Sequence, residues 1–192
     1  AKLVYRNLLE YRNALTVLND ASSKPLNRIN ALMVVGDKRF ILKNYLGAEL
    51  SYRDAYDIFQ DNKCKSDRKI KMRIKRKLAR ALCYNDDGHE MAIKEYYGVL
   101  KIGEKHRNYY DIALSYCGLG WVACDDEDTP LAMEYYDKAI NSIDKMRPTN
   151  VKDKNRKVKV KALVHSGLAD LFTSTNDLDK AITWTKVAIE HN

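Results

Sequence analysis

Apolar side chains recur every three or four positions along most of this chain, which is the spacing that gathers them on one face of an α-helix. Strict alternation, which is typical of a half-buried strand, is nearly absent and is confined to the run 158–161. The pattern therefore predicts nine helices joined by short connections. They are expected at 3–18, 29–45, 46–59, 70–84, 91–102, 109–124, 131–143, 158–172 and 178–189.

Polar and helix-breaking residues separate the predicted helices. They occupy 22–25, 85–88, 125–130, 147–150 and 174–177. In the third of these turns, Asp128 or Thr129 is expected to cap the next helix, with Pro130 at its first helical position. A helix, a polar turn and a second helix thus recur four times along the chain.

A pattern of small and aromatic residues repeats with these helix pairs. Each second helix begins with a small residue, followed by an aromatic four positions later and a small residue three positions after that. The pattern is clear in Ala48, Tyr52, Ala55 and in Ala132, Tyr136, Ala139, and weaker in Ala92, Tyr96, Val99 and in Ala181, Thr185, Ala188. Another small residue lies twelve positions upstream at Gly36, Gly120 and Ala169.

Small residues let two antiparallel helices approach closely, and the aromatic fills the gap toward the next helix. Each helix pair then buries only part of its apolar surface. Such pairs are stable only when they stack on one another, as in repeat proteins.

Two stretches carry a family resemblance. The sequences Leu-Ser-Tyr-Cys-Gly-Leu-Gly-Trp-Val-Ala-Cys at 114–124 and Leu-Ala-Met-Glu-Tyr-Tyr-Asp-Lys-Ala-Ile at 131–140 resemble a tetratricopeptide repeat. The segment 91–106, leading to Gly118-Leu-Gly120, resembles the longer variety of about 40 residues found in Leu-Gly-Asn repeat proteins and kinesin light chains. The resemblance implies an all-α, right-handed solenoid of helical hairpins, with about four repeats and a flanking amino-terminal helix.

On this interpretation the chain is a single domain, 1–192, and we expect it to be a piece of a longer protein. The flanking helix is expected at 1–20. The repeats are expected at 29–62, 68–106, 109–147 and 155–192.

The resemblance also implies a concave groove, lined by the first helix of each repeat, that binds a peptide or helix of another protein. Trp121 is the most prominent candidate anchor in this groove, although it could equally pack against a neighbouring helix. The chaperone-binding clamp of the family is not reproduced at these positions. The positions expected in the groove are Asn30, Met33, Asp37, Lys77, Tyr84, Leu114, Cys117, Trp121, Leu163, Ser166 and Asp170.

The net charge of +8 is concentrated in two segments, and the rest of the chain is net acidic. The segments 63–80 and 145–161 hold ten and eight basic residues, each with a single acid. A solvated helix face, an acidic partner peptide, nucleic acid, a nuclear-import signal and an anionic membrane surface all remain open as interpretations. The absence of aromatic residues from 63–82 disfavours single-strand base stacking. The proposed basic edge consists of Arg73, Lys75, Arg76, Arg80, Lys157, Lys159 and Lys161.

No catalytic constellation is visible in the sequence. The four histidines, His89, His106, His165 and His191, lack metal-binding spacing, and no phosphate-binding loop or nucleophile motif occurs. The carboxylates at 125–128 lack the alternating ligands of a calcium loop. We therefore expect no metal, no cofactor and no enzymatic activity.

The four cysteines, at 64, 83, 117 and 124, form no C-x-x-C motif and are expected to be reduced thiols of an intracellular protein. No membrane span or secretory signal is visible, so the cytoplasm is the expected location, with the nucleus as the alternative.

The sequence predicts a protein–protein interaction scaffold. The alternative is binding of nucleic acid or another polyanion through 63–80 and 151–161.

Overall fold

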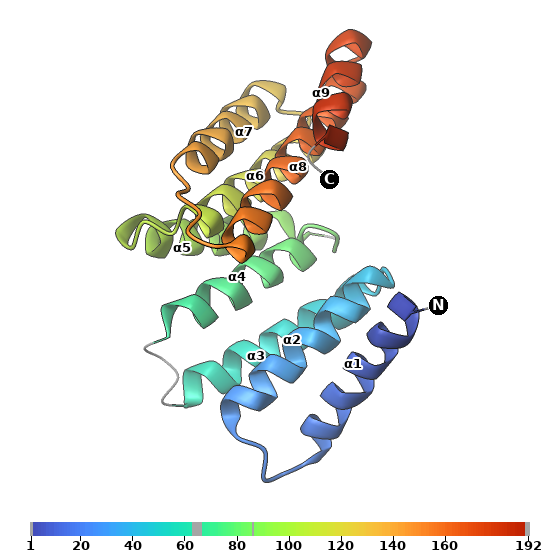
Figure 1. Cartoon of the computed structure of the whole chain (residues 1–192), viewed down its shortest axis with the longest axis vertical. Helices are drawn as coiled ribbons and strands as arrows, with labels where there is room; N and C mark the ends of the chain where they lie inside the picture. Colours follow the sequence, from blue (N-terminus) through green and yellow to red (C-terminus); the bar gives the residue numbers. More distant parts are fainter. Residues whose placement is uncertain (1, 63–66, 86, 191–192) are drawn as a thin grey trace. The chain divides into compact units, whose positions relative to one another are not determined.

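The computed structural model describes residues 2–62, 67–85 and 87–190, with side chains for 6–62, 67–85 and 87–189. Within these residues the chain is all-α, as predicted, and forms nine helices without a strand (Figure 1). None of the helices in the described part of the chain is long and apolar enough to cross a membrane. The helices are α1 (Lys2–Asn19), α2 (Pro25–Ile41), α3 (Tyr45–Asp61), α4 (Arg68–Leu82), α5 (His89–Lys105), α6 (Tyr109–Asp125), α7 (Thr129–Asp144), α8 (Val151–Ser174) and α9 (Leu178–Glu190).

The chain divides into two compact units, Ala1–Glu95 and Tyr96–Asn192, with the boundary inside α5. In the first unit α2 packs against α1 and α3, and α3 packs against α4. In the second unit α7 packs against α6 and α8, while α8 also packs against α6 and α9. The expectation of a single repeat domain stays a prediction.

Four of the turns between helices share one backbone design. A residue with left-handed backbone (φ of 52 to 60°) ends one helix, and the N–H of the next residue donates to the carbonyl five residues before it, at 2.9 Å. In three of these turns that next residue is also the N-cap of the following helix, because its side chain accepts a backbone N–H. The pairs of left-handed and following residue are Lys43–Asn44, Arg107–Asn108, Glu127–Asp128 and Asn176–Asp177.

Glycine against tyrosine is the central packing contact of the helix pairs. A Cβ atom built on Gly36 of α2 would lie 2.4 Å from Cε1 of Tyr52 on α3. In the second unit Tyr136 of α7 fills the space between two helices, since a Cβ on Gly120 of α6 would lie 2.9 Å from its ring and one on Gly167 of α8 would lie 2.6 Å from its hydroxyl. Tyr136 thus contacts both α6, the first helix of its own pair, and α8, the first helix of the next pair.

Several boundaries differ from the sequence-based expectation; the helix predicted over 70–84, for example, runs from Arg68 to Leu82 and leaves Tyr84 outside it. The helix predicted over 29–45 ends at Ile41, because Lys43 adopts the left-handed backbone and Leu42 to Asn44 form the turn. The helix predicted over 158–172 begins seven residues earlier, at Val151. Asp128 is the N-cap of α7, so Thr129 takes the first helical position that was expected for Pro130.

Candidate functional site

The first helices of unit 1, α2 and α4, are joined by polar contacts between predicted groove residues. The Lys77 ammonium on α4 forms an ion pair with the Asp37 carboxylate on α2, and the Tyr52 hydroxyl donates to the same carboxylate oxygen at 2.8 Å. Nearer the start of α2, the Arg73 guanidinium donates to the Asn30 side-chain oxygen at 2.5 Å. Four of the residues expected at the groove or the basic edge therefore contact one another in pairs.

Burial shifts the pKa of the central groups of this network. Desolvation lowers the pKa of Lys77, and the neighbouring Asp37 carboxylate partly opposes that shift. Desolvation also raises the pKa of the Tyr52 phenol above its usual range, and the charge of Asp37 adds to the increase. The ammonium of Lys77 is therefore held in place by one carboxylate, and the Tyr52 hydroxyl stays a hydrogen-bond donor to the same group.

An aromatic cluster lies at the end of this polar row. Tyr45 stacks on Tyr84 with ring centroids 4.5 Å apart, and Phe40 meets both rings edge to face at 5.2 and 5.3 Å. The Arg80 guanidinium lies over the Phe40 ring, 4.4 Å from its centroid. Tyr84 is 40% exposed, so the cluster offers an aromatic surface beside a charged row.

Met33 differs from the other predicted groove residues of unit 1. It is only 4% exposed, because its position on α2 turns the thioether into the core. Its side chain is therefore not available to a partner in this structure, whereas Asn30 is exposed and Asp37 is half-buried.

Four cations of α4 (Arg73, Lys75, Lys77 and Arg80) contact neighbouring helices, whereas the side chains of Arg68, Lys69 and Lys71 make no hydrogen bond, ion pair or ring contact with a described residue. Lys75 forms an ion pair with Glu95 of α5, and its ammonium lies over the Tyr56 ring of α3 at 5.0 Å. With Arg73 and Arg80, which contact Asn30 and Phe40 of α2, three of the four basic-edge residues expected on this helix are engaged with other helices. Arg76 is half-buried. Positions 63–66 at the start of the basic segment, which include Cys64, lie outside the described residues. His191 also lies outside them.

In unit 2 the predicted groove residues lie on α6 and α8. Cys117 and Trp121 are half-buried on α6, and Ser166 and Asp170 are exposed on α8. Burial raises the pKa of the Tyr136 phenol, and the neighbouring Cys117 and Asp170 add to the increase. Gly120 of α6 and Gly167 of α8 both lie against this tyrosine, so the two helices face the same side chain. Desolvation raises the pKa of the Asp170 carboxyl as well.

The basic segment of α8 is less involved in contacts than that of α4. Arg156 pairs with Asp153 at 3.5 Å and lies over the Tyr110 ring of α6 at 5.4 Å, while Lys157 donates to the Met146 carbonyl at 3.2 Å. By contrast, the side chains of four lysines of this helix make no hydrogen bond, ion pair or ring contact with any described residue. They are Lys152, Lys154, Lys159 and Lys161.

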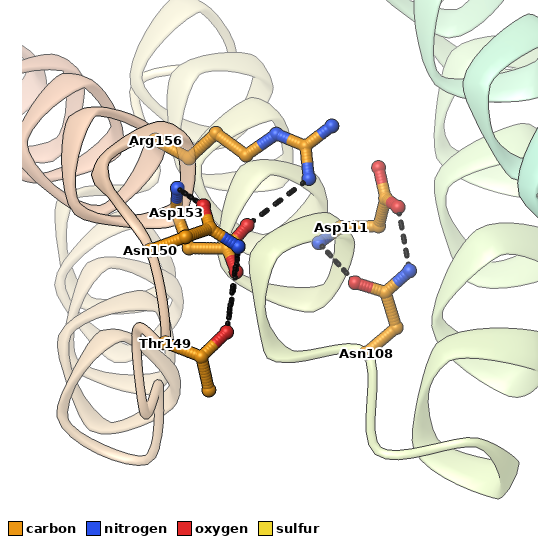
Figure 2. Close-up of polar contacts among 6 residues, drawn as sticks. All are labelled: Asn108, Asp111, Thr149, Asn150, Asp153 and Arg156. Atoms are coloured by element: carbon orange, nitrogen blue, oxygen red, sulfur yellow. Dashed lines mark hydrogen bonds and ion pairs between the residues drawn. The ribbon is translucent and has the colours of Figure 1, made fainter.

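Two matching Asn–Asp caps fix the starts of α6 and α8, and Figure 2 shows them in one view. Asn150 accepts the N–H of Asp153 at 2.9 Å and donates its amide to the Asp153 carboxylate at 2.9 Å. Asn108 makes the same two contacts with Asp111, at 3.4 and 2.8 Å. Each cap satisfies a backbone N–H that the helix itself leaves without an acceptor.

A tyrosine cluster in unit 2, formed by side chains of α5, α6 and α7, was not predicted as functional. The hydroxyls of Tyr97 and Tyr135 lie 2.8 Å apart, and Tyr135 stacks on Tyr116 with centroids 6.3 Å apart. The Lys138 ammonium lies over both of these stacked rings, at 5.8 and 5.6 Å from their centroids. The excess of 13 tyrosines over 3 phenylalanines was the only signal in the sequence for such polar aromatic contacts. No group of three or more His, Cys, Asp or Glu side chains arranged to hold a metal ion occurs among the described residues.

Comparison with known proteins supports the fold. No family model and no curated protein matches the chain. Among solved structures, the chain is similar to the crystal structure of BtubC (BKLC) from P. vanneervenii, with 19% identity, a TM-score of 0.65, and coverage of 100% of this chain and 74% of that chain. That protein is kinesin light chain-like and has a tetratricopeptide-like helical fold. The present chain is thus an all-α protein with the architecture of a helical-hairpin solenoid.

Proposed function

We propose that this protein is a non-catalytic interaction scaffold, built from tetratricopeptide-type repeats, that binds a peptide or helical segment of another protein along its first helices. The observation that carries the proposal is the surface of α2 and α4, where the 40% exposed Tyr84, in the turn just after α4, lies beside a charged row. Exposed aromatic side chains next to ordered polar groups are typical anchors of partner segments.

The charges of this surface favour an acidic partner segment. Three cations of α4, Arg73, Lys77 and Arg80, face α2, which supplies the Asp37 carboxylate to Lys77 and an uncharged amide to Arg73. A partner carboxylate near this row would meet fixed cations that need little reorganisation. In unit 2, Trp121 and the exposed Ser166 and Asp170 offer a second, less basic surface of the same kind.

Crosslinking affinity capture from cell lysate tests this proposal. The unchanged protein is compared with Tyr84→Ala, Trp121→Ala and a control, Tyr97→Ala, which removes a 49% exposed tyrosine from a second helix. We expect a protein partner that is lost with Tyr84→Ala or Trp121→Ala and retained with Tyr97→Ala. Equal capture by all four proteins would contradict binding through the first helices.

The second candidate function is polyanion binding, and the free lysines of α8 favour it. On α4 four cations (Arg73, Lys75, Lys77 and Arg80) are engaged with other helices. By contrast, the side chains of Lys152, Lys154, Lys159 and Lys161 make no hydrogen bond, ion pair or ring contact with a described residue. Contacts of free lysines with phosphates weaken steeply as salt rises, by counterion release. Anisotropy of a labelled RNA oligonucleotide at rising salt, with Lys152→Glu plus Lys159→Glu, tests this. RNA binding that is unchanged by the two substitutions would contradict polyanion binding through α8. Nuclease added to the affinity-capture experiment distinguishes a protein partner from one held through nucleic acid.

Reduced thiols support an intracellular setting for the proposed scaffold. Cys83, Cys117 and Cys124 are thiols, not disulfides, among the described residues. We infer the cytoplasm as the site of action, with the nucleus as the alternative, because thiols persist in reducing compartments.

A further inference from the structure

α8 begins earlier than the comparable first helices α2 and α6. Those two helices have 17 residues each, whereas α8 has 24, and all three end two positions before the left-handed residue of the following turn. The additional residues of α8 therefore lie at its start. No side chain of 151–159 is buried, and the first buried residue of the helix is Val160. Packing of the helix pairs thus does not account for this extension.

The extended start of α8 is strongly cationic. The segment 151–161 holds six Lys or Arg residues and one acid, Asp153. The Asp153 carboxylate pairs with Arg156 at 3.5 Å and accepts the side-chain amide of Asn150 at 2.9 Å (Figure 2). The side chains of four of the cations make no hydrogen bond, ion pair or ring contact with a described residue, so their charge is available to a partner. They are Lys152, Lys154, Lys159 and Lys161.

An uncharged strip runs along the exposed face of this segment. At 3.6 residues per turn, the positions of Val151, Asn155 and Val158 lie within about 60° of one another around the axis of α8. Val151 is 71% exposed and Val158 is 44% exposed. Asn155, which lies between them along the helix, is exposed as well. The strip therefore presents one amide and two small apolar side chains.

The four lysines flank this strip on both sides. Lys152 and Lys159 lie roughly 80° from its centre in one direction, and Lys154 and Lys161 lie roughly 80° from it in the other. Within each pair the two lysines are seven positions apart, which is about two helical turns. The segment thus has a row of positive charge along each edge and no charge between the rows.

This arrangement is complementary to the major groove of B-form DNA. The groove is about 12 Å wide and admits an α-helix. Phosphates border it on both sides, so a lysine row along each edge of the helix meets one backbone strand. At the base edges, an asparagine side chain pairs with adenine through two hydrogen bonds, and small apolar groups contact the methyl group of thymine.

The same features disfavour other polyanions. The major groove of A-form RNA is too deep and narrow for side chains to read. Single strands are held by stacking on aromatic side chains, and 151–161 contains none. Helices that lie on a bilayer bury large side chains such as Trp, Phe and Leu, whereas this strip offers two valines and an amide.

We propose that the start of α8 binds in the major groove of duplex DNA, with the four lysines on the phosphates and Asn155 at the base edges. This inference rests on the second candidate function above, polyanion binding through α8, and names the polyanion. One helix with four phosphate contacts binds weakly, with a dissociation constant of roughly 1–100 μM near physiological salt.

Anisotropy of a short labelled DNA duplex at rising salt tests the lysine contacts. Four phosphate contacts predict a slope of about −3.6 for log K against log salt. Lys152→Gln plus Lys159→Gln removes one row, and Lys154→Gln plus Lys161→Gln removes the other. Each pair of substitutions should halve the slope and weaken binding at low salt at least tenfold. A slope that either pair leaves unchanged overturns the proposal.

The matched control removes two exposed cations at the start of another first helix. In Arg68→Gln plus Lys69→Gln the net charge falls as much as in the α8 variants, and neither side chain has a printed partner to lose. DNA binding should be unchanged in this control. A loss as large as in the α8 variants would mean that DNA responds to net charge alone, which overturns binding through α8.

Two further probes separate this inference from the function on which it rests. They are an RNA duplex of the same sequence and vesicles of phosphatidylcholine and phosphatidylserine. We expect the DNA duplex to bind at least tenfold more tightly than the RNA duplex, and the vesicles not to bind. Equal binding of both duplexes, or binding of the vesicles alone, overturns insertion into the DNA groove but leaves polyanion binding in place. Binding to none of the three overturns both.

Selection from a randomised DNA duplex library tests the base contact of Asn155. The unchanged protein should enrich duplexes with adenine at a fixed position. Asn155→Ala should lose this enrichment and keep the salt dependence, because a base contact adds specificity without releasing counterions. Asn141→Ala, which removes an exposed asparagine from α7, is the control and should keep the enrichment. The same enrichment in Asn155→Ala, or none in the unchanged protein, overturns the placement of Asn155 at the base edges.

Discussion

Gly36 lies against the ring of Tyr52 so closely that a Cβ atom on the glycine would be 2.4 Å from the tyrosine Cε1. Both residues are in the buried contact between α2 and α3, and Tyr52 is only 2% exposed. The same relationship recurs between Gly120 and Tyr136, where the corresponding distance is 2.9 Å. Each helix pair can therefore pack this closely only because one residue at the contact is glycine, which has no side chain.

Replacement of Gly36 by alanine is expected to destabilise the protein. Alanine gains about 1 kcal/mol of helix propensity over glycine, but overpacking against the buried ring costs about 1–3 kcal/mol or more. We expect a net loss of roughly 1–2 kcal/mol for Gly36→Ala. Gly120→Ala should lose less, because its contact leaves more room. Urea denaturation of both variants gives the comparison, and a loss in Gly120→Ala that exceeds the one in Gly36→Ala would contradict it.

The packing of the helix pairs could be predicted from sequence because it is local and periodic. Gly36 and Tyr52 are sixteen residues apart, as are Gly120 and Tyr136, so one spacing rule found both contacts. The end of α2 was missed because Leu42 continues the apolar period through the turn. The left-handed residue there is Lys43, a residue type that carries no signal for that backbone.

The partners of charged residues could not be predicted in the same way. Lys75 and Lys77 are two positions apart on α4, yet one pairs with Glu95 of α5 and the other with Asp37 of α2. Which helix lies on which side of α4 depends on the angles between helices. Those angles are not encoded in the spacing along a single helix.

The two ion-paired lysines of α4 should matter more for stability than the free lysines of α8. In Lys75→Met, Glu95 loses its partner while only 22% exposed, which is expected to cost roughly 1–2 kcal/mol after allowance for solvent screening. Lys159→Met removes a side chain without a partner among the described residues and should stay within about 0.5 kcal/mol. Thermal unfolding of the two variants measures the difference, and equal stability would mean that the ion pair of Lys75 contributes nothing.

The two buried tyrosine hydroxyls are expected to respond differently to removal. In Tyr52→Phe the Asp37 carboxylate loses a hydrogen bond of 2.8 Å, and we expect a loss of about 1–2 kcal/mol. The Tyr136 hydroxyl makes only a 3.7 Å contact with the Cys124 sulfur, so Tyr136→Phe should change stability by less than about 0.5 kcal/mol. Chemical denaturation of both variants is the measurement. A larger loss in Tyr136→Phe would contradict the assignment of hydrogen bonds.

The caps of α6 and α8 provide another matched pair. Asn108→Ala and Asn150→Ala each remove an N-cap, a change that costs about 1 kcal/mol. Asn108 also donates to Asp111, which is buried, whereas its counterpart Asp153 is half-buried. We therefore expect the larger loss for Asn108→Ala, and equal losses in urea denaturation would show that burial of the second carboxylate has no effect.

Asp37→Asn tests the ion pair at the centre of the first-helix surface through its pH dependence. Burial already lowers the pKa of Lys77, and the Asp37 charge is what opposes this shift. Without that charge, folding must bury an unpaired ammonium, and we expect a loss of roughly 1–3 kcal/mol at pH 7 after discount for partial exposure. The pKa of Lys77 should fall further in the folded variant.

The sign of the pH effect follows from the direction of that shift. Between the lowered pKa of Lys77 in the folded state and 10.5 in the unfolded state, the unfolded chain binds more protons, so stability rises with pH. In Asp37→Asn the pKa of Lys77 in the folded state is lower still, so the pH range over which stability rises begins at a lower pH. The variant should therefore recover part of its loss between pH 7 and pH 9.5, relative to the unchanged protein.

Urea denaturation of both proteins at the two pH values measures this recovery. Asp54→Asn, which alters an exposed carboxylate without a partner among the described residues, is the control and should show neither the loss nor the recovery. A loss in Asp37→Asn that is the same at both pH values would mean that Lys77 keeps its proton without Asp37. The charged row on α2 and α4 would then owe its order to packing, and Asp37 would be free to accept a hydrogen bond from a partner.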